Sequence, residues 1–329
     1  MTVPAWVWGA TILGVLLLIA FDFFMVSRTP HEVSMGEATR WSIFYVAIAV
    51  IFGVGVYAFM GSQSGTEFFA AYLVEKSLSV DNLFVFAIIL TQFAVPSVLQ
   101  QRVLLIGIVL ALIFRAVFIA VGAAALAAFA FTFVIFGALL IWTGIQLARH
   151  HNEDPDPSDN FMVKAIRKRY PFTDEYHGTA MFIKEAGKRV ATPMLLVIVA
   201  IGSTDLLFAL DSIPATFGVT QNAYLVFTAN AFALFGLRAL YFLLKGLLDR
   251  LVYLSLGLAA ILVFIGIKLI LTWAHETWSQ VPKIPTLLSL GVIALILVIA
   301  TVASLIKSRQ DPTLTAHAGT VTKPDRDEG

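Results

Sequence analysis

The sequence predicts an all-α membrane protein of about nine transmembrane helices, in which spans three to five are repeated, inverted, as spans six to eight. Three observations carry this prediction: the composition, the apolar runs, and the basic residues between the runs. The 329-residue chain is 59% hydrophobic and 13% charged, and its mean hydropathy is +0.88. This composition excludes an ordinary soluble domain.

Nine apolar runs approach the ~20 residues that a helix needs to cross a bilayer core. They are continuous and do not alternate, which favours helices over a β-barrel. The first contains Asp22 and follows no basic segment, so we expect a retained span and not a cleaved signal peptide. The predicted spans are residues 4–26, 42–60, 68–92, 103–121, 127–148, 194–213, 223–242, 251–273 and 285–306.

Basic residues alternate between the connecting segments. Lys and Arg occur in the first, third, fifth and seventh connections and after the last run, but not before the first run or in the second, fourth and sixth connections, and the eighth carries only Lys283. Because cytoplasmic segments carry an excess of these residues, the N-terminus is predicted outside and the C-terminus in the cytoplasm. The transmembrane domain then covers residues 1–309, with a cytoplasmic loop at 149–192 and a disordered tail at 310–329. Within the loop, residues 150–157 resemble a polar linker, and 179–184 could form a short strand.

Two similar acidic motifs lie inside predicted spans. An ionised side chain there costs ~2.5–3.5 kcal/mol by insertion scales, so four acids need an explanation, and an ion pathway is the default one. The motifs read Glu75-Lys-Ser-Leu-Ser-Val-Asp81-Asn82 and Asp205-Leu-Leu-Phe-Ala-Leu-Asp211-Ser212.

Two further matches extend this likeness along the chain. Residues 114–118 match 237–241, with Arg115 opposite Arg238, and residues 139–147 match 261–269. Since each copy has three spans, an odd number, the copies insert with opposite orientations. Inverted repeats of this kind are typical of secondary transporters, whose sites lie near the midplane between the copies.

The two acids of one motif cannot chelate one ion within a regular helix. Six residues rise ~9 Å and leave the two side chains about 120° apart in azimuth. Their partners must therefore come from the other copy, unless the helix unwinds. Carboxylate, amide and hydroxyl oxygens, in a chain without cysteine, suit hard cations such as Mg²⁺, Ca²⁺ or Mn²⁺. Desolvated carboxylates also suit proton relay.

The candidate metal site follows from these residues. The proposed ligands are Glu75, Asp81, Asn82, Asp205, Asp211 and Ser212, supported by Asp22, Ser79, Thr204, Arg115 and Arg238. An alternative is that the acids only pair with Lys76, Arg115 and Arg238 to lock helix packing. The four repeated acids plus Asp22 outnumber these bases, so carboxylates would remain for a proton or a metal. The two arginines are either structural counter-charges or gating elements. Asp22 either lines an inner vestibule or reaches the membrane interface. Lys268 can snorkel, which means that its ammonium extends to the interface.

The two motifs, with Phe21-Asp22 and residues 30–34, strongly resemble the TerC family of integral membrane proteins, within the LysE-like transporter superfamily. The resemblance covers roughly residues 10–306. The family is named for tellurium resistance, and its bacterial Alx-type members are associated with manganese efflux. It implies an inner-membrane location, Mn²⁺ or a similar divalent cation as substrate, and ion handling by the six proposed ligands.

The leading hypothesis is therefore an inner-membrane exporter of a divalent cation, most simply Mn²⁺, with proton coupling as an open addition. We expect no enzymatic activity, no resident cofactor and no nucleic-acid partner, while the protein partners are not predicted. The alternatives are an exporter of an organic cation, such as a basic amino acid, and a tellurium-resistance or envelope-stress protein without direct transport. An intramembrane aspartyl protease is disfavoured, because the expected Gly-x-Gly-Asp reads Gly202-Ser-Thr-Asp205 here.

Overall fold

The computed structural model describes residues 3–28, 33–153, 160–185, 188–244, 251–278, 280–282, 284–311 and 317. Within these ranges the side chains of residues 26–28, 81, 244 and 276 lie outside the description. One proposed ligand, the side chain of Asp81, is therefore not placed. The predicted linker is described only up to residue 153, and most of the predicted tail lies outside the described residues.

Helices make up most of the described chain, and seven of them are long and apolar enough to cross a membrane. The multi-pass helical architecture is thereby confirmed. These seven helices are α1 (Ala5–Arg28), α2 (Met35–Met60), α4 (Ser97–Ala128), α5 (Thr132–Arg149), α7 (Pro193–Val219), α10 (Leu254–Thr277) and α11 (Thr286–Gln310).

The two remaining predicted spans are unusual helices. Helix α3 (Ser62–Gln92) carries Glu75, Lys76 and Asp81 in its middle and is not among the seven. The run at 223–242 forms α8 (Ala223–Leu234) and α9 (Leu237–Leu244), bent by 40° at their junction. Gly236 in this junction has a φ of +79°, which glycine adopts without a Cβ penalty. Counted as one span, the pair gives eight, so nine spans stay a prediction.

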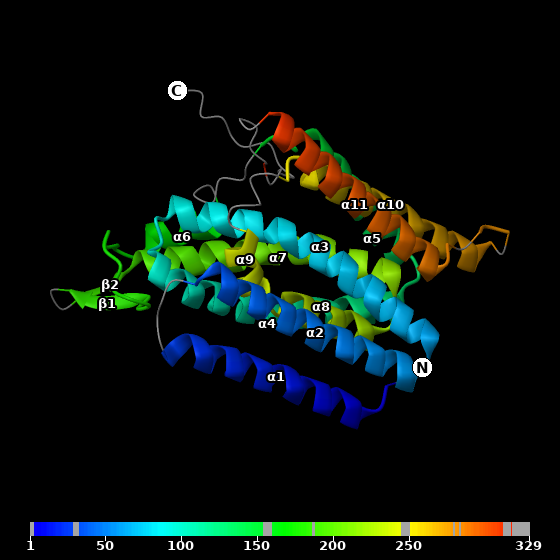
Figure 1. Cartoon of the computed structure of the whole chain (residues 1–329), viewed down its shortest axis with the longest axis horizontal. Coiled ribbons are helices and arrows are strands. Elements are labelled where there is room, and N and C mark those ends of the chain that lie inside the picture. The colour runs from blue at the N-terminus through cyan, green and yellow to red at the C-terminus, as the bar shows by residue number, and fades with distance from the viewer. Residues whose placement is uncertain are drawn as a thin grey trace.

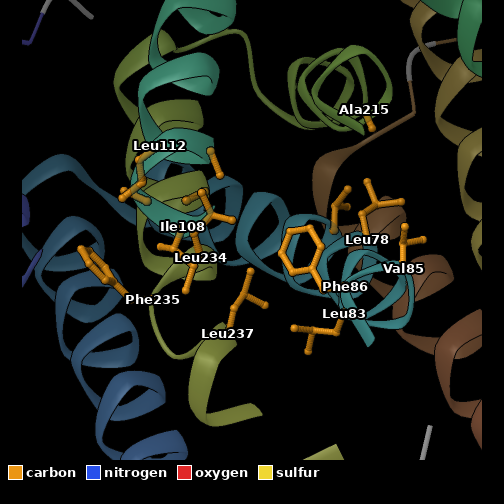
Figure 2. Packing of buried hydrophobic residues seen from close by; sticks show 14 of the residues in the cluster. Leu78, Leu83, Val85, Phe86, Ile108, Leu112, Ala215, Leu234, Phe235 and Leu237 are labelled. Carbon is orange, nitrogen blue, oxygen red and sulfur yellow. The ribbon is translucent and has the colours of Figure 1, made fainter. Parts of the chain in front are cut away.

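The helices form a central group with a layer on either side (Figure 1). Helix α3 packs against α2, α7, α8 and α11, and α4 packs against α7 and α8. Helix α1 covers one edge, while α5, α10 and α11 form the other. Figure 2 shows the apolar packing between the central helices, with Leu78 and Phe86 from α3, Ile108 and Leu112 from α4, and Leu234 from α8. The charged motifs of α3 and α7 thus lie in the middle of the bundle.

Helices α5 and α10 approach closely through two glycines in a reciprocal way. A side chain at Gly144 would meet the Ala259 carbonyl oxygen at 2.9 Å, and one at Gly266 would meet the Gly137 carbonyl oxygen at 2.7 Å. In the predicted repeat Gly144 corresponds to Gly266, and Gly137 to Ala259. The two close approaches therefore involve corresponding positions of the predicted repeat.

The predicted cytoplasmic loop holds a short helix and a hairpin. Helix α6 (Phe161–Arg169) packs on α7. Strands β1 (Phe182–Glu185) and β2 (Lys188–Ala191) pair antiparallel, with Phe182 opposite Ala191. The strand expected within residues 179–184 corresponds to β1. The hairpin projects beyond the helical bundle at its left-hand end in Figure 1.

Candidate functional site

One arginine holds together side chains from both acidic motifs. Arg115, on α4, is 1% exposed and ion-pairs with Glu75 of α3 and Asp205 of α7. Its Nη1 also donates to the Ser212 Oγ at 3.0 Å and the Asn230 Oδ1 at 2.9 Å, and its Nη2 reaches the Asp205 Oδ1 at 3.4 Å. These five residues, called here the Arg115 cluster, join α3, α4, α7 and α8.

The charges of the Arg115 cluster do not cancel. Two carboxylates face one guanidinium, so one negative charge remains when both acids are ionised. Glu75 and Asp205 are 0% and 1% exposed, and charges buried this deeply require a partner. Asp205 is the less well satisfied of the two, because its Oδ2 has no hydrogen-bond partner among the described residues. The cluster therefore keeps a buried oxygen that could accept a proton or a cation.

Further oxygens surround the pair of carboxylates. The Thr216 hydroxyl lies 3.4 Å from the Glu75 Oε2 and 2.8 Å from the Ser212 carbonyl oxygen. With its amide turned to satisfy both ends, Asn82 accepts from the Arg115 Nη2 at 3.2 Å and donates to a backbone carbonyl of α3. The Ser79 hydroxyl is buried without a partner in the described part of the chain. This donor set of carboxylates, hydroxyls and amides is the kind that hard divalent cations prefer.

The other proposed ligands are not brought into this cluster. Asp211 is half-buried and lies beside Thr143 of α5, away from Arg115, as six residues of helix require. Thr204 is half-buried and Asp81 is not placed. Accordingly, the residues that the structure describes contain no group of three or more His, Cys, Asp or Glu side chains able to hold a metal.

A second buried ion pair lies apart from the first. Arg238, at the start of α9, donates to the Asp22 Oδ1 of α1 at 2.5 Å and to the Gln101 Oε1 of α4 at 2.9 Å. Asp22 is 6% exposed, so this carboxylate is a buried counter-charge that ties α1 to the broken span. Arg115 and Arg238, which correspond in the predicted repeat, thus have different surroundings.

The third base, Lys76, pairs with backbone oxygens. Its ammonium donates to the carbonyl of Ala233 at 3.0 Å and lies 3.4 Å from that of Phe235. These carbonyls lie at the end of α8, where a helix has unsatisfied acceptors and a partial negative charge. Lys76 therefore caps the break next to Glu75.

The two ends of the α3–α7 pair differ. Where α3 begins and α7 ends, a cavity of about 710 Å³ opens between them and helices α10 and α11. Lys268 lines this cavity and is 6% exposed; whether it reaches the membrane interface stays a prediction.

At the opposite end, the loop covers the helices. Asn160, which caps α6, donates to the Ser203 Oγ of α7 at 2.7 Å. The Tyr176 hydroxyl donates to the Phe93 carbonyl at the end of α3 at 2.6 Å, and burial raises the pKa of Tyr176 to about 12. The loop is thus fastened to both α3 and α7, close to Asp205.

Sequence reasoning missed three contributors to these clusters: Thr216, Asn230 and Gln101. Thr216 lies one turn after Ser212, so extending the polar face of the second motif would have found it. Asn230 is an amide inside a predicted span, which is itself a signal of a buried polar contact. Gln101 lies just before a predicted span, where a polar residue carries no such signal.

The fold and this buried charged centre define a multi-pass integral membrane protein. The sequence model of the integral membrane protein TerC family matches residues 60–312, and the chain belongs to that family. An uncharacterized membrane protein of Myxococcus xanthus is 41% identical over 94% of this chain and 95% of its own length.

Two further relatives cover most of the chain. An uncharacterized membrane protein of Mycobacterium tuberculosis H37Rv is 46% identical over 84% of this chain and 70% of its own length. An Escherichia coli K12 protein named "Putative membrane-bound redox modulator Alx" is 36% identical over 88% of this chain and 91% of its own length. No solved structure matches the chain.

Proposed function

We propose that this protein exports a divalent cation, most simply Mn²⁺, across a bacterial inner membrane. The observation that carries the proposal is that buried carboxylates from both acidic motifs, Glu75 and Asp205, converge on one guanidinium. Asp205 retains an unpartnered buried oxygen within the described residues. A carboxylate pair deep in a membrane bundle is a functional feature by default, and the family resemblance favours Mn²⁺ as the cargo.

In this proposal Arg115 and the cation occupy the carboxylates in turn. With Arg115 in place, the two ionised acids and the guanidinium carry one net negative charge. A divalent cation that replaced the guanidinium would bring this group to neutrality, whereas one that joined it would leave a buried positive charge. Because unpaired charge is expensive in a low-dielectric interior, replacement requires that the displaced guanidinium reach water or another counter-charge. Arg115 is thus a gating element that closes the site when it is empty.

The remaining acids complete the proposed route. Asp81 and Asp211 are the second positions of the two motifs, and we propose that they accept the cation or carry returning protons. Coupling to protons or to another gradient is needed, because an inside-negative potential opposes cation export by ~2.3 kcal/mol per charge per 100 mV.

The inverted repeat belongs to the same proposal. The reciprocal approach of Gly144 and Gly266 supports it, since a twofold axis between α5 and α10 would generate such a pair of contacts. The pairings of α3 with α8 and of α4 with α7 also exchange under that axis. The N-terminus would lie outside and the C-terminus in the cytoplasm, in keeping with the basic connections.

The proposal also excludes other roles. The protein would act on its cation as cargo, with no enzymatic step and no resident cofactor. A thiol-based redox role is excluded for this chain, because it contains no cysteine, although one relative is named a redox modulator. An organic cation or a stress role without transport remains an alternative outcome of the test.

The test is Mn²⁺ flux in proteoliposomes that contain purified protein and a trapped metal-sensitive dye. We expect flux from the wild type and a loss of at least tenfold in Asp205→Asn, Asp81→Asn and Asp211→Asn. Glu175→Gln, an exposed acid of the loop, is the matched charge control and should match the wild type. Wild-type rates in the three aspartate variants would reject the site, and absence of flux from folded wild-type protein would favour the non-transporting role. Inhibition of Mn²⁺ flux by added free lysine would favour an organic cation as the cargo.

A further inference from the structure

The cavity at the start of α3 is lined by both polar and apolar residues and is distinct from the Arg115 cluster. Its walls come from the start of α3, the end of α7, α10 and the start of α11. Among its lining residues Glu67 is the sole acid, and the described structure holds this carboxylate in place. The Glu67 Oε2 accepts from the Thr220 hydroxyl at 2.7 Å, and the Oε1 accepts from the Gln63 amide at 3.0 Å.

A line of polar side chains joins this cavity to the buried cluster. Glu67 and Glu75 are eight residues apart on α3. Ser212 and Thr216 are four apart on α7, and Thr220, four residues further on, is the C-cap that follows α7. Residues four and eight apart lie on one face of a helix. The two faces meet, because Thr220 bonds to Glu67 and Thr216 lies within 3.4 Å of Glu75.

The two contacts, Glu67–Thr220 and Glu75–Thr216, are eight residues apart on α3, about 12 Å, but four residues apart on the α7 side, about 6 Å by helix geometry. We call this strip the α3–α7 seam. It is narrow in the present structure, since Thr216 is 0% and Thr220 3% exposed. Neighbouring positions on α7 face apolar surroundings, and Ala215, beside Thr216, packs in the hydrophobic core. The seam is therefore a single polar line through an apolar interior.

We propose that the α3–α7 seam is the path by which a cation passes between the Arg115 cluster and the cavity, and that Glu67 is a second, outer binding site for a hydrated divalent cation. The identity of the ion rests on the proposed export function, but the path itself does not. Hydroxyl and carboxylate oxygens spaced by one helical turn offer successive replacements for the water that the cation sheds. The large cavity lets the cation at Glu67 keep most of its hydration shell.

The absence of cysteine allows the seam to be probed without background. Single variants Thr220→Cys, Thr216→Cys and Ala215→Cys would be made in the full chain and treated in membranes with a small cationic methanethiosulfonate. Labelling rates would be measured with and without Mn²⁺. Ala215→Cys is the matched control, because it adjoins Thr216 but faces the core.

We expect Thr220→Cys to react fastest, Thr216→Cys more slowly, and Ala215→Cys at least tenfold more slowly than Thr216→Cys. Mn²⁺ should slow both seam positions. Adding Glu67→Gln to Thr220→Cys should raise the Mn²⁺ concentration for half protection by about fivefold or more, since removal of a nearby charge weakens cation binding. Adding Glu175→Gln to Thr220→Cys should leave the Mn²⁺ concentration for half protection unchanged.

Two results would overturn the inference. If Thr216→Cys reacts no faster than Ala215→Cys, the seam is not a path. If Glu67→Gln leaves Mn²⁺ protection unchanged, Glu67 is not a cation site. These labelling readouts are separate from flux. Protection of the seam by Mn²⁺ in a protein that shows no Mn²⁺ flux would support the path and reject export. Mn²⁺ flux in a protein whose seam cannot be labelled would support export and reject the path.

Discussion

Glu75→Gln and Asp205→Asn each remove one negative charge from the Arg115 cluster, but we expect very different effects on stability. Glu75 forms the close ion pair with Arg115, and its second oxygen lies near the Thr216 hydroxyl. Asp205 contacts Arg115 at 3.4 Å, and its other oxygen has no partner in the described part of the chain. One carboxylate is therefore satisfied at both oxygens and the other at one.

The magnitudes follow from this difference. At 3.4 Å the Asp205–Arg115 attraction is about 5 kcal/mol for an effective dielectric constant of ~20. Desolvation costs several kcal/mol per buried ion, so the net contribution of Asp205 is close to zero. We expect Asp205→Asn to change the free energy of unfolding by less than ~1 kcal/mol, and Glu75→Gln to lower it by ~2–4 kcal/mol. Arg115→Met, which strands two buried carboxylates, should cost at least ~3–5 kcal/mol.

Intrinsic fluorescence can follow unfolding, because the chain has six tryptophans. Denaturant or thermal unfolding of the purified variants, with Glu175→Gln as the control, should give the order Asp205→Asn, Glu75→Gln, Arg115→Met from least to most destabilised. Equal destabilisation by Asp205→Asn and Glu75→Gln would refute the reasoning, since it would mean that both acids are equally satisfied. A stable Asp205→Asn that no longer transports Mn²⁺ would separate the role of Asp205 in function from folding.

The remaining predictions concern packing, capping and the loop. Gly266→Val should lower the free energy of unfolding by ~2 kcal/mol or more by overpacking against Gly137. Gly291→Val, which faces open space, should leave it unchanged or raise it by up to ~0.5 kcal/mol, because Val is a better helix former than Gly. The thermal midpoint checks both. Lys76→Met should cost ~1–3 kcal/mol by leaving carbonyls at the end of α8 unsatisfied, and Lys76→Arg should retain more of this stability. Asn160→Ala should detach α6 from α7, seen as faster proteolysis of the loop with little change in the midpoint of the bundle.

The apolar runs predicted the helices well, because a bilayer-length stretch of hydrocarbon side chains has few alternatives to a helix. Each predicted span is helical over most of its length. The junction at Gly236 was not foreseen, since glycine is common in membrane helices and does not by itself break one. The break is stabilised from another helix, by Lys76, and such a tertiary contact has no local sequence signal.

The candidate site was predicted in part. The 120° separation within each motif agrees with the position of Asp211 away from the contacts of Asp205. Glu75 and Asp205 converge on one group, whereas helix levels in the predicted repeat pair Glu75 with Asp211 and Asp81 with Asp205. That group is Arg115, which sequence reasoning left open as counter-charge or gate. Spacing alone could not tell the two arginines apart, because their local sequences match while their neighbours, Glu75 for one and Asp22 for the other, come from different helices.

The same break connects the two arginines mechanically. Before it, α8 is tied to the Arg115 cluster by Asn230 and to α3 by Lys76. After it, α9 is tied to α1 and α4 by Arg238. If a cation displaces the Arg115 guanidinium, α8 loses its tie through Asn230, whereas the ties of α9 are untouched. The two halves of the broken span would then move differently, with Gly236 absorbing the change, so a buried charge exchange would become a helix movement next to α3.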